Sequence, residues 1–89
     1  MKEIYWGKTY NTDTGKYICT RVRISHSIGG SVESCTHIYL RNKDQRPFVH
    51  KFVFQYNEEG VCYYKSERIL PITEEQYNEY INSEYIKIT

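Results

Sequence analysis

The sequence predicts an α+β domain, a small antiparallel β-sheet of about five strands with one short C-terminal helix packed on one face. Three observations predict it. Short stretches alternate apolar and polar residues with the period of two that strands require. Clusters of Gly, Asn, Asp and Ser separate these stretches, and a helix-initiation pattern stands near the C-terminus. The length of 89 residues fits a single domain, residues 1–89, with one modest core.

The N-terminal part contains two predicted strands. Ile4 and Trp6 alternate with their neighbours and predict the first strand, and residues 11–15 supply the Asn, Asp and Gly of a turn. The second strand has the clearest alternation, with aliphatic side chains on one face and a Tyr, a Cys and two Arg on the other. The first set is Ile18, Val22 and Ile24, and the second is Tyr17, Cys19, Arg21 and Arg23.

Residues 26–31 contain two Gly and two Ser and predict the longest loop of the chain. A strand over 36–41 follows, with Ile38 and Leu40 facing one way and His37, Tyr39 and Arg41 the other. The next two predicted strands, 48–56 and 61–65, flank the four-residue hairpin loop 57–60, which ends in Gly.

The strongest local pattern predicts a helix over 73–83. Thr73 and Gln76 have the spacing of a capping box, in which each side chain bonds the other residue's backbone amide. Two Glu in the first turn suit the positive end of the helix dipole. Tyr77, Tyr80 and Ile81 form an apolar stripe at helical spacing. Residues 85–88 then predict a last strand.

Combining the strands predicts a covered face and an open one. The covered face should hold the helix and the following residues: Ile4, Trp6, Ile18, Val22, Ile24, Ile38, Leu40, Phe52, Phe54 and Tyr63. The open face should hold the candidate ligand-binding residues: Tyr17, Arg21, Arg23, His37, Tyr39, Arg41 and Lys51. Aromatic rings stack on bases and Arg pairs with phosphates, so this face suits a nucleotide or nucleic acid. A solvated sheet face or a protein partner would use the same residues.

Metal binding and catalysis find little support in the sequence. Cys19, His26, Cys35 and His37 could form a four-ligand set, but zinc ligands usually come in close pairs and these spacings are irregular. The three histidines could act as acids or bases, yet no nucleophile elbow, P-loop or zinc-protease motif accompanies them. We therefore expect no metal, no cofactor and no enzymatic activity.

Targeting and charge features favour a cytoplasmic protein that does not enter a membrane. The first residues lack the apolar run of a signal peptide, and no stretch of about 18 apolar residues occurs. Residues 1–65 contain ten Lys/Arg and six Asp/Glu, whereas residues 66–89 contain two and five. The acidic end is most simply a solvated helix face, and the alternative is mimicry of nucleic-acid phosphates.

These features favour a small non-catalytic interaction protein. Ten tyrosines suit an interface, because Tyr is enriched there. Frequent Tyr, Ile, Lys and Asn, which have A/T-rich codons, suggest a low-GC bacterium or its phage. We expect an inhibitor of the phage or mobile-element type, whose partner is a host (defence) protein or protein–nucleic acid complex. The alternative is sequestration of a nucleotide or nucleic acid. Exposed sheet edges would also allow a homodimer.

Overall fold

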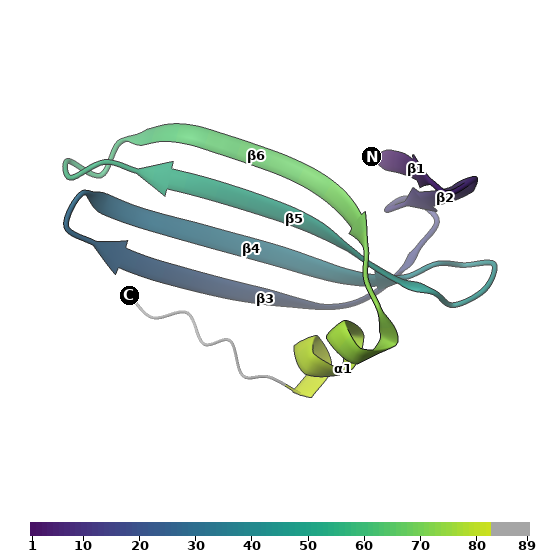
Figure 1. The fold of residues 1–89 in the computed structure, drawn as a ribbon. Coiled ribbons are helices and arrows are strands. Elements are labelled where there is room, and N and C mark those ends of the chain that lie inside the picture. The colour runs from purple at the N-terminus through teal and green to yellow at the C-terminus, as the bar shows by residue number, and fades with distance from the viewer. Residues whose placement is uncertain (83–89) are drawn as a thin grey trace.

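The computed structural model describes residues 1–82, which form six strands and one helix (Figure 1). The strands are β1 (Lys2–Tyr5), β2 (Lys8–Asn11), β3 (Lys16–Ser27), β4 (Gly30–Leu40), β5 (Pro47–Tyr56) and β6 (Cys62–Pro71), and the helix is α1 (Glu74–Asn82). The strands make two antiparallel sheets, a β1–β2 hairpin and a β3-β4-β5-β6 meander. An α+β fold with a C-terminal helix is confirmed, but six strands in two sheets replace about five strands in one.

Pairing across the four-stranded sheet decides which side chains share a face, because paired residues on neighbouring antiparallel strands point the same way. Two cross-strand rows define the two faces. Val22, Cys35, Phe52 and Glu67 lie in one row, on what we call the aromatic face. Arg21, Thr36, Lys51 and Arg68 lie in the next row, on what we call the cationic face.

The β1–β2 hairpin covers one end of the aromatic face. Tyr10, Phe48 and Ile69 form a buried cluster there, and Tyr5 and Tyr39 pack against it. The Tyr10 and Phe48 rings meet edge to face at 5.5 Å between centroids. The Tyr5 hydroxyl donates a 2.6 Å hydrogen bond to the Ile69 carbonyl, which ties the hairpin to β6.

Helix α1 lies over the same end of the sheet on the cationic face. Ile38 and Val49, which are fully buried, belong to this face. Arg21 donates to the carbonyls of Tyr80, at 2.9 Å, and Ile81, at 3.3 Å, near the C-terminal end of the helix. Arg21 therefore satisfies carbonyls that the last helical turn leaves without intrahelical partners.

The other end of the sheet extends away from both covering elements (Figure 1). The molecule measures 44 × 25 × 19 Å, and the β3–β4 and β5–β6 turns lie at the far end of the long axis. Within residues 1–82, no helix or strand covers either face there. Ile28, at the β3–β4 turn, is 98% exposed.

The predicted core was largely wrong. Of its ten residues only Ile38 belongs to the buried hydrophobic core, whose other members are Tyr10, Phe48, Val49 and Ile69. Val22, Ile24, Phe52 and Phe54 lie on the face opposite α1, whereas Ile38 and Leu40 lie on the face that α1 covers. Ile4, Trp6 and Tyr63 are exposed. The alternation of residue types shows which residues of one strand share a face, but only the cross-strand register shows which residues of different strands do. In addition, a bulge between Tyr17 and Cys19 changes which residues of β3 point to each face on its two sides.

The turns and the helix cap agree better with the sequence-based predictions than the core does. The Gln76 amide donates to Thr73 Oγ1 at 3.1 Å and the Thr73 amide to Gln76 Oε1 at 3.0 Å, so the capping box is confirmed. Gly60 has the positive φ expected of the 57–60 hairpin loop. The predicted loop over 26–31 is shorter in the structure, because β3 continues to Ser27 and β4 begins at Gly30, which leaves a turn of two residues, Ile28 and Gly29. The predicted strand over 85–88 lies outside the described residues.

Candidate interaction surfaces

The structure divides the seven candidate ligand-binding residues among three places. Arg21, Arg23 and Lys51 lie on the cationic face, which carries α1; Tyr17, His37 and Tyr39 lie on the aromatic face; and Arg41 follows the end of β4. The prediction that all seven share one face away from the helix was therefore wrong. The cause is again the cross-strand register, which places Arg21 beside Thr36 and Lys51.

The cationic face nevertheless gathers positive charge. Arg68, which the sequence analysis did not single out, pairs with Lys51 and extends the row that Arg21 begins. Arg23 lies two residues further along β3, on the same face. A cavity of about 70 Å³ lies among Arg21, Arg23, Ser34, Thr36, Lys51 and Tyr80. Its size suits a water molecule or a single small group, and Arg21 is already engaged with the helix.

The aromatic face contains a network of polar groups centred on two histidines. Thr20 Oγ1 lies 2.7 Å from His37 Nδ1 and is also bonded to the Tyr17 hydroxyl. The Cys35 Sγ lies 3.8 Å from His37 Nε2 on the other side of the ring. His50 is nearly buried and its Nε2 lies 2.7 Å from Glu67 Oε1.

This network has the electrostatics of a packed polar cluster rather than of an activated thiol. Burial and the nearby Glu33 carboxylate raise the pKa of the Cys35 thiol, and burial and His50 lower the pKa of His37. Both shifts favour the neutral forms, whereas a nucleophilic cysteine needs a lowered pKa. Within residues 1–82, no three His, Cys, Asp or Glu side chains gather as a metal would require. Cys19 lies on the cationic face, away from Cys35.

Arg41 has partners that fix a turn. Its Nε donates to the Thr9 carbonyl at 2.9 Å, and its Nη1 contacts Asp44 Oδ2 at 2.7 Å. The guanidinium also lies 5.7 Å from the centre of the Tyr10 ring. Arg41 therefore joins β2 to the 42–46 turn, a structural role that the sequence could not indicate.

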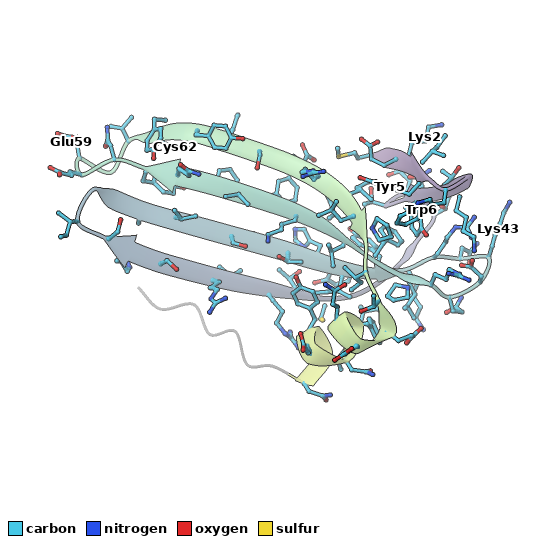
Figure 2. All side chains as sticks on the ribbon, viewed as in Figure 1. Lys2, Tyr5, Trp6, Lys43, Glu59 and Cys62 are labelled. Carbon is cyan, nitrogen blue, oxygen red and sulfur yellow. The ribbon has the colours of Figure 1, made fainter. Side chains whose placement is uncertain are left out.

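A more distinctive surface lies at the β1–β2 turn, where Trp6 is 85% exposed (Figure 2). Trp6 and Gly7 form a two-residue turn and both have positive φ, 52° and 74°. Such turns favour Asn-Gly, because Asn and Gly tolerate positive φ, whereas a bulky side chain is disfavoured there. The turn thus holds the largest apolar side chain of the chain in solvent, in a backbone conformation that costs about 1–3 kcal/mol.

A groove of about 640 Å³ lies beside this indole. We call it the Trp6 groove, and its lining comes from the β1–β2 hairpin, the start of β5, and the segment that joins β6 to α1. The lining residues are Trp6, Lys8, Tyr10, Asp44, Arg46, Pro47, Pro71, Ile72, Thr73 and Glu74. Two prolines and the capped helix start hold its wall, and Lys8 and Arg46 each contact Asp44 at its rim, at 3.5 and 3.3 Å.

Sequence reasoning placed Trp6 in a strand and in the core, so it missed this surface. The signal was the following Gly7, which with Trp6 separates two short runs of strand-forming residues. Comparisons with protein-family models, with curated proteins and with solved structures find no match for this chain. Among residues 1–82 no helix is long and apolar enough to cross a membrane.

Proposed function

We propose that this protein is a small non-catalytic interaction protein that binds a partner protein by inserting Trp6 into a pocket on the partner's surface. The observation that supports the proposal is the exposed indole on a strained two-residue turn. Tryptophan is among the residues most enriched at the energetic centres of interfaces. Replacing Trp6 by Asn or Gly would relieve the backbone strain of this turn. Strained residues cluster at functional sites, so the presence of Trp at this position favours a functional role for it.

The Trp6 groove supplies the surroundings that such an anchor needs. Pro47, Pro71 and Ile72 give it apolar walls, and Asp44, Arg46 and Glu74 give it a charged rim. Interfaces commonly combine an apolar centre with a polar rim. The groove is also held in place before binding by the capping box and by the contacts of Asp44, so little ordering entropy is lost.

The class that fits best is an inhibitor of the phage or mobile-element type that occupies a surface on a host defence macromolecule in the cytoplasm. Its support is the ten tyrosines, a residue type enriched at interfaces, and the raised pKa of the Cys35 thiol, which is the opposite of what an activated nucleophile needs. The protein would act by steric occupation of its target, with no chemistry of its own.

A matched pair of variants tests the role of Trp6. Trp6→Asn removes the indole and installs the residue that the turn prefers. Ile28→Asn replaces another exposed apolar side chain by Asn, at the β3–β4 turn, and serves as the control. Wild-type protein and both variants are immobilised and used to capture proteins from a lysate of the source host, and the captured protein is then titrated in purified form. We expect Ile28→Asn to bind like wild type, and Trp6→Asn to bind at least ~30-fold more weakly, as for a hot spot worth about 2 kcal/mol.

The free energy of unfolding provides the control for these variants. Trp6→Asn should equal wild type or exceed it by up to about 1 kcal/mol, because the turn strain is relieved. Equal binding of the purified partner by wild type and Trp6→Asn would refute the proposal. Loss of binding in Ile28→Asn to the same extent would refute it as well.

A second candidate, binding of a nucleotide or nucleic acid, rests on the row of Arg21, Lys51 and Arg68 on the cationic face. Lys51→Ala with Arg68→Ala removes two of these charges and leaves the Arg21 contacts to the helix in place. Binding of a labelled oligonucleotide that weakens steeply with salt, and that this double variant abolishes, would favour the second candidate. Salt-independent or absent binding would exclude it.

A further inference from the structure

The cavity of about 70 Å³ on the cationic face has a lining that suits an anion. Three of its lining residues are cationic, the other three carry hydroxyl groups, and none is acidic: Arg21, Arg23, Lys51, Ser34, Thr36 and Tyr80. The volume is about twice the ~30 Å³ that a water molecule occupies in the liquid. The cavity therefore has room for a single tetrahedral oxyanion and not for a base or a sugar.

Thr36 presents an unused hydroxyl to this cavity. The residue is only 3% exposed, and its Oγ1 has no hydrogen-bond partner among residues 1–82. No side-chain oxygen or nitrogen in that part of the chain is both fully buried and unpaired, so this oxygen is open to the cavity that Thr36 lines. The half-buried Ser34 lines the same cavity, and its hydroxyl has no partner there either. Buried polar groups are normally paired, so these two hydroxyls favour a polar ligand in the cavity.

Positive side chains lie next to each other at this site without an acidic neighbour on the sheet. Lys51 and Arg68 are paired directly across β5 and β6, and neither side chain makes an ion pair or a hydrogen bond within residues 1–82. Like charges in such a pair destabilise a sheet. The only acidic residues of β3 to β6 are Glu33 and Glu67, and both point to the aromatic face. A bound anion would offset the repulsion between the two cations.

Helix α1 forms one wall of the cavity through Tyr80 and adds no carboxylate to it, because the three glutamates of the helix are absent from the lining. The last carbonyls of a helix carry partial negative charge. Arg21 donates to two of them, those of Tyr80 and Ile81, and also to the Thr20 carbonyl. These bonds use three of the five N–H groups of a guanidinium, so two remain for a ligand.

We propose that this cavity binds the phosphate group of a small phosphate monoester, with Lys51 as its charge partner and with hydrogen bonds from Arg21 and from the Ser34 and Thr36 hydroxyls. A phosphate monoester carries about −1.5 to −2 charges at pH 7 and three acceptor oxygens, which these donors match. A phosphodiester needs room on two sides of the phosphorus, and a cavity of this size does not offer it. The site rests on the second candidate function above, because it uses the same cationic row, and it narrows the ligand to a small molecule with a terminal phosphate.

Two phosphate esters test the ligand class. Methyl phosphate and dimethyl phosphate are each titrated into isotope-labelled protein at constant ionic strength, and the backbone amide resonances of β4 and β5 are followed by NMR. We expect methyl phosphate to saturate the site with a dissociation constant of about 1 mM or below, and dimethyl phosphate to bind at least ~10-fold more weakly. Equal binding of the two esters would overturn the proposal. The absence of any saturable shift up to about 20 mM methyl phosphate would overturn it as well.

A matched pair of charge variants locates the site. Lys51→Met removes the ammonium group and keeps most of the side chain, and Lys65→Met makes the same change on the aromatic face. The dissociation constant of methyl phosphate should rise at least ~10-fold in Lys51→Met and stay within ~2-fold of wild type in Lys65→Met. Thr36→Val removes the hydroxyl, keeps the shape of the side chain and should raise the constant at least ~3-fold. Equal effects of the two lysine variants would contradict the assignment.

Three controls separate this site from the fold and from the proposed functions. The urea midpoint of Lys51→Met should equal or exceed that of wild type, because the repulsion from Arg68 is removed. Trp6→Asn should bind methyl phosphate like wild type, so a failure of the partner-binding proposal is distinguishable from a failure of this one. Binding of an oligonucleotide that Lys51→Ala with Arg68→Ala abolishes, without any binding of methyl phosphate, would support the second candidate function and overturn the phosphate site.

Discussion

Gly29 and Gly30 stand next to each other at the β3–β4 turn, and only the second has a conformation that excludes other residues. Gly30 has a φ of +138°, and a Cβ built on it would lie 1.9 Å from the Tyr56 carbonyl oxygen. A Cβ on Gly29 meets nothing within 4 Å. The close approach of the β4 backbone to β5 at this point therefore depends on one hydrogen atom in place of a side chain.

We expect Gly30→Ala to lower the free energy of unfolding by roughly 1–3 kcal/mol, because the backbone must leave its φ or β4 must move from β5. Gly29→Ala should be within about 0.5 kcal/mol of wild type. Urea unfolding of the two variants beside wild type measures the difference. Equal midpoints for both variants would show that β4 and β5 do not approach as closely as the structure has them.

His37 makes the stability of the protein depend on pH. Burial and His50 lower its pKa in the folded state, so below a pH of about 6.5 the unfolded chain takes up a proton at this position more readily than the folded one. Stability should therefore fall as the pH decreases through this region, and the fall should be smaller in His37→Gln. Unfolding midpoints at about pH 7.5 and about pH 5.5 provide the comparison. An equal loss in both proteins would mean that other groups cause it.

Side-chain hydrogen bonds stabilise helix α1 at both of its ends. At the first, Thr73 and Gln76 satisfy each other's amides as the sequence predicts. At the second, Arg21 donates to the Tyr80 and Ile81 carbonyls from a strand some sixty residues earlier, a contact that no local pattern could indicate. A nine-residue helix is marginal by itself, so this docking contributes to its formation.

We expect Arg21→Ala to destabilise the protein by about 1.5–3 kcal/mol, the range of hydrogen bonds from a charged donor. Arg68→Ala removes an exposed guanidinium from the same face, so it should have little effect and serves as the matched control. Helical content from far-ultraviolet circular dichroism and urea unfolding report the outcome. A fully stable Arg21→Ala would mean that this side chain is free to bind a ligand, as the sequence alone suggested.

The strands show which structural features can be predicted from a single sequence and which cannot. Alternation within 16–27 and 36–41 correctly separated Arg21 from Val22 and His37 from Ile38. It could not reveal the bulge after Tyr17 or the pairing of Arg21 with Thr36, and these decide which residues share a face. Seven residues predicted to form one binding surface were dispersed for this reason. The sequence predicted a strand position for Trp6, because tryptophan is not among the residues that dominate turns.

The molecule as a whole is unevenly covered. Both buried clusters, Tyr10 with Phe48 and Ile38 with Val49, lie at the same end of the sheet, and the other end extends beyond the hairpin and the helix. This arrangement leaves two surfaces with different properties. The Trp6 groove presents one large side chain on a rigid frame, and the aromatic face presents a broad apolar area with charges at its sides.

Trp6 is the single tryptophan of the chain and reports directly on the proposed binding site. Its fluorescence is recorded while the purified partner is added, and the same titration with Trp6→Phe is subtracted to remove the partner's own emission. If the indole enters a pocket on the partner, its emission shifts to shorter wavelength and it becomes protected from quenching by acrylamide. Unchanged emission and unchanged quenching with the partner at saturation would show that Trp6 stays in water and that binding occurs elsewhere.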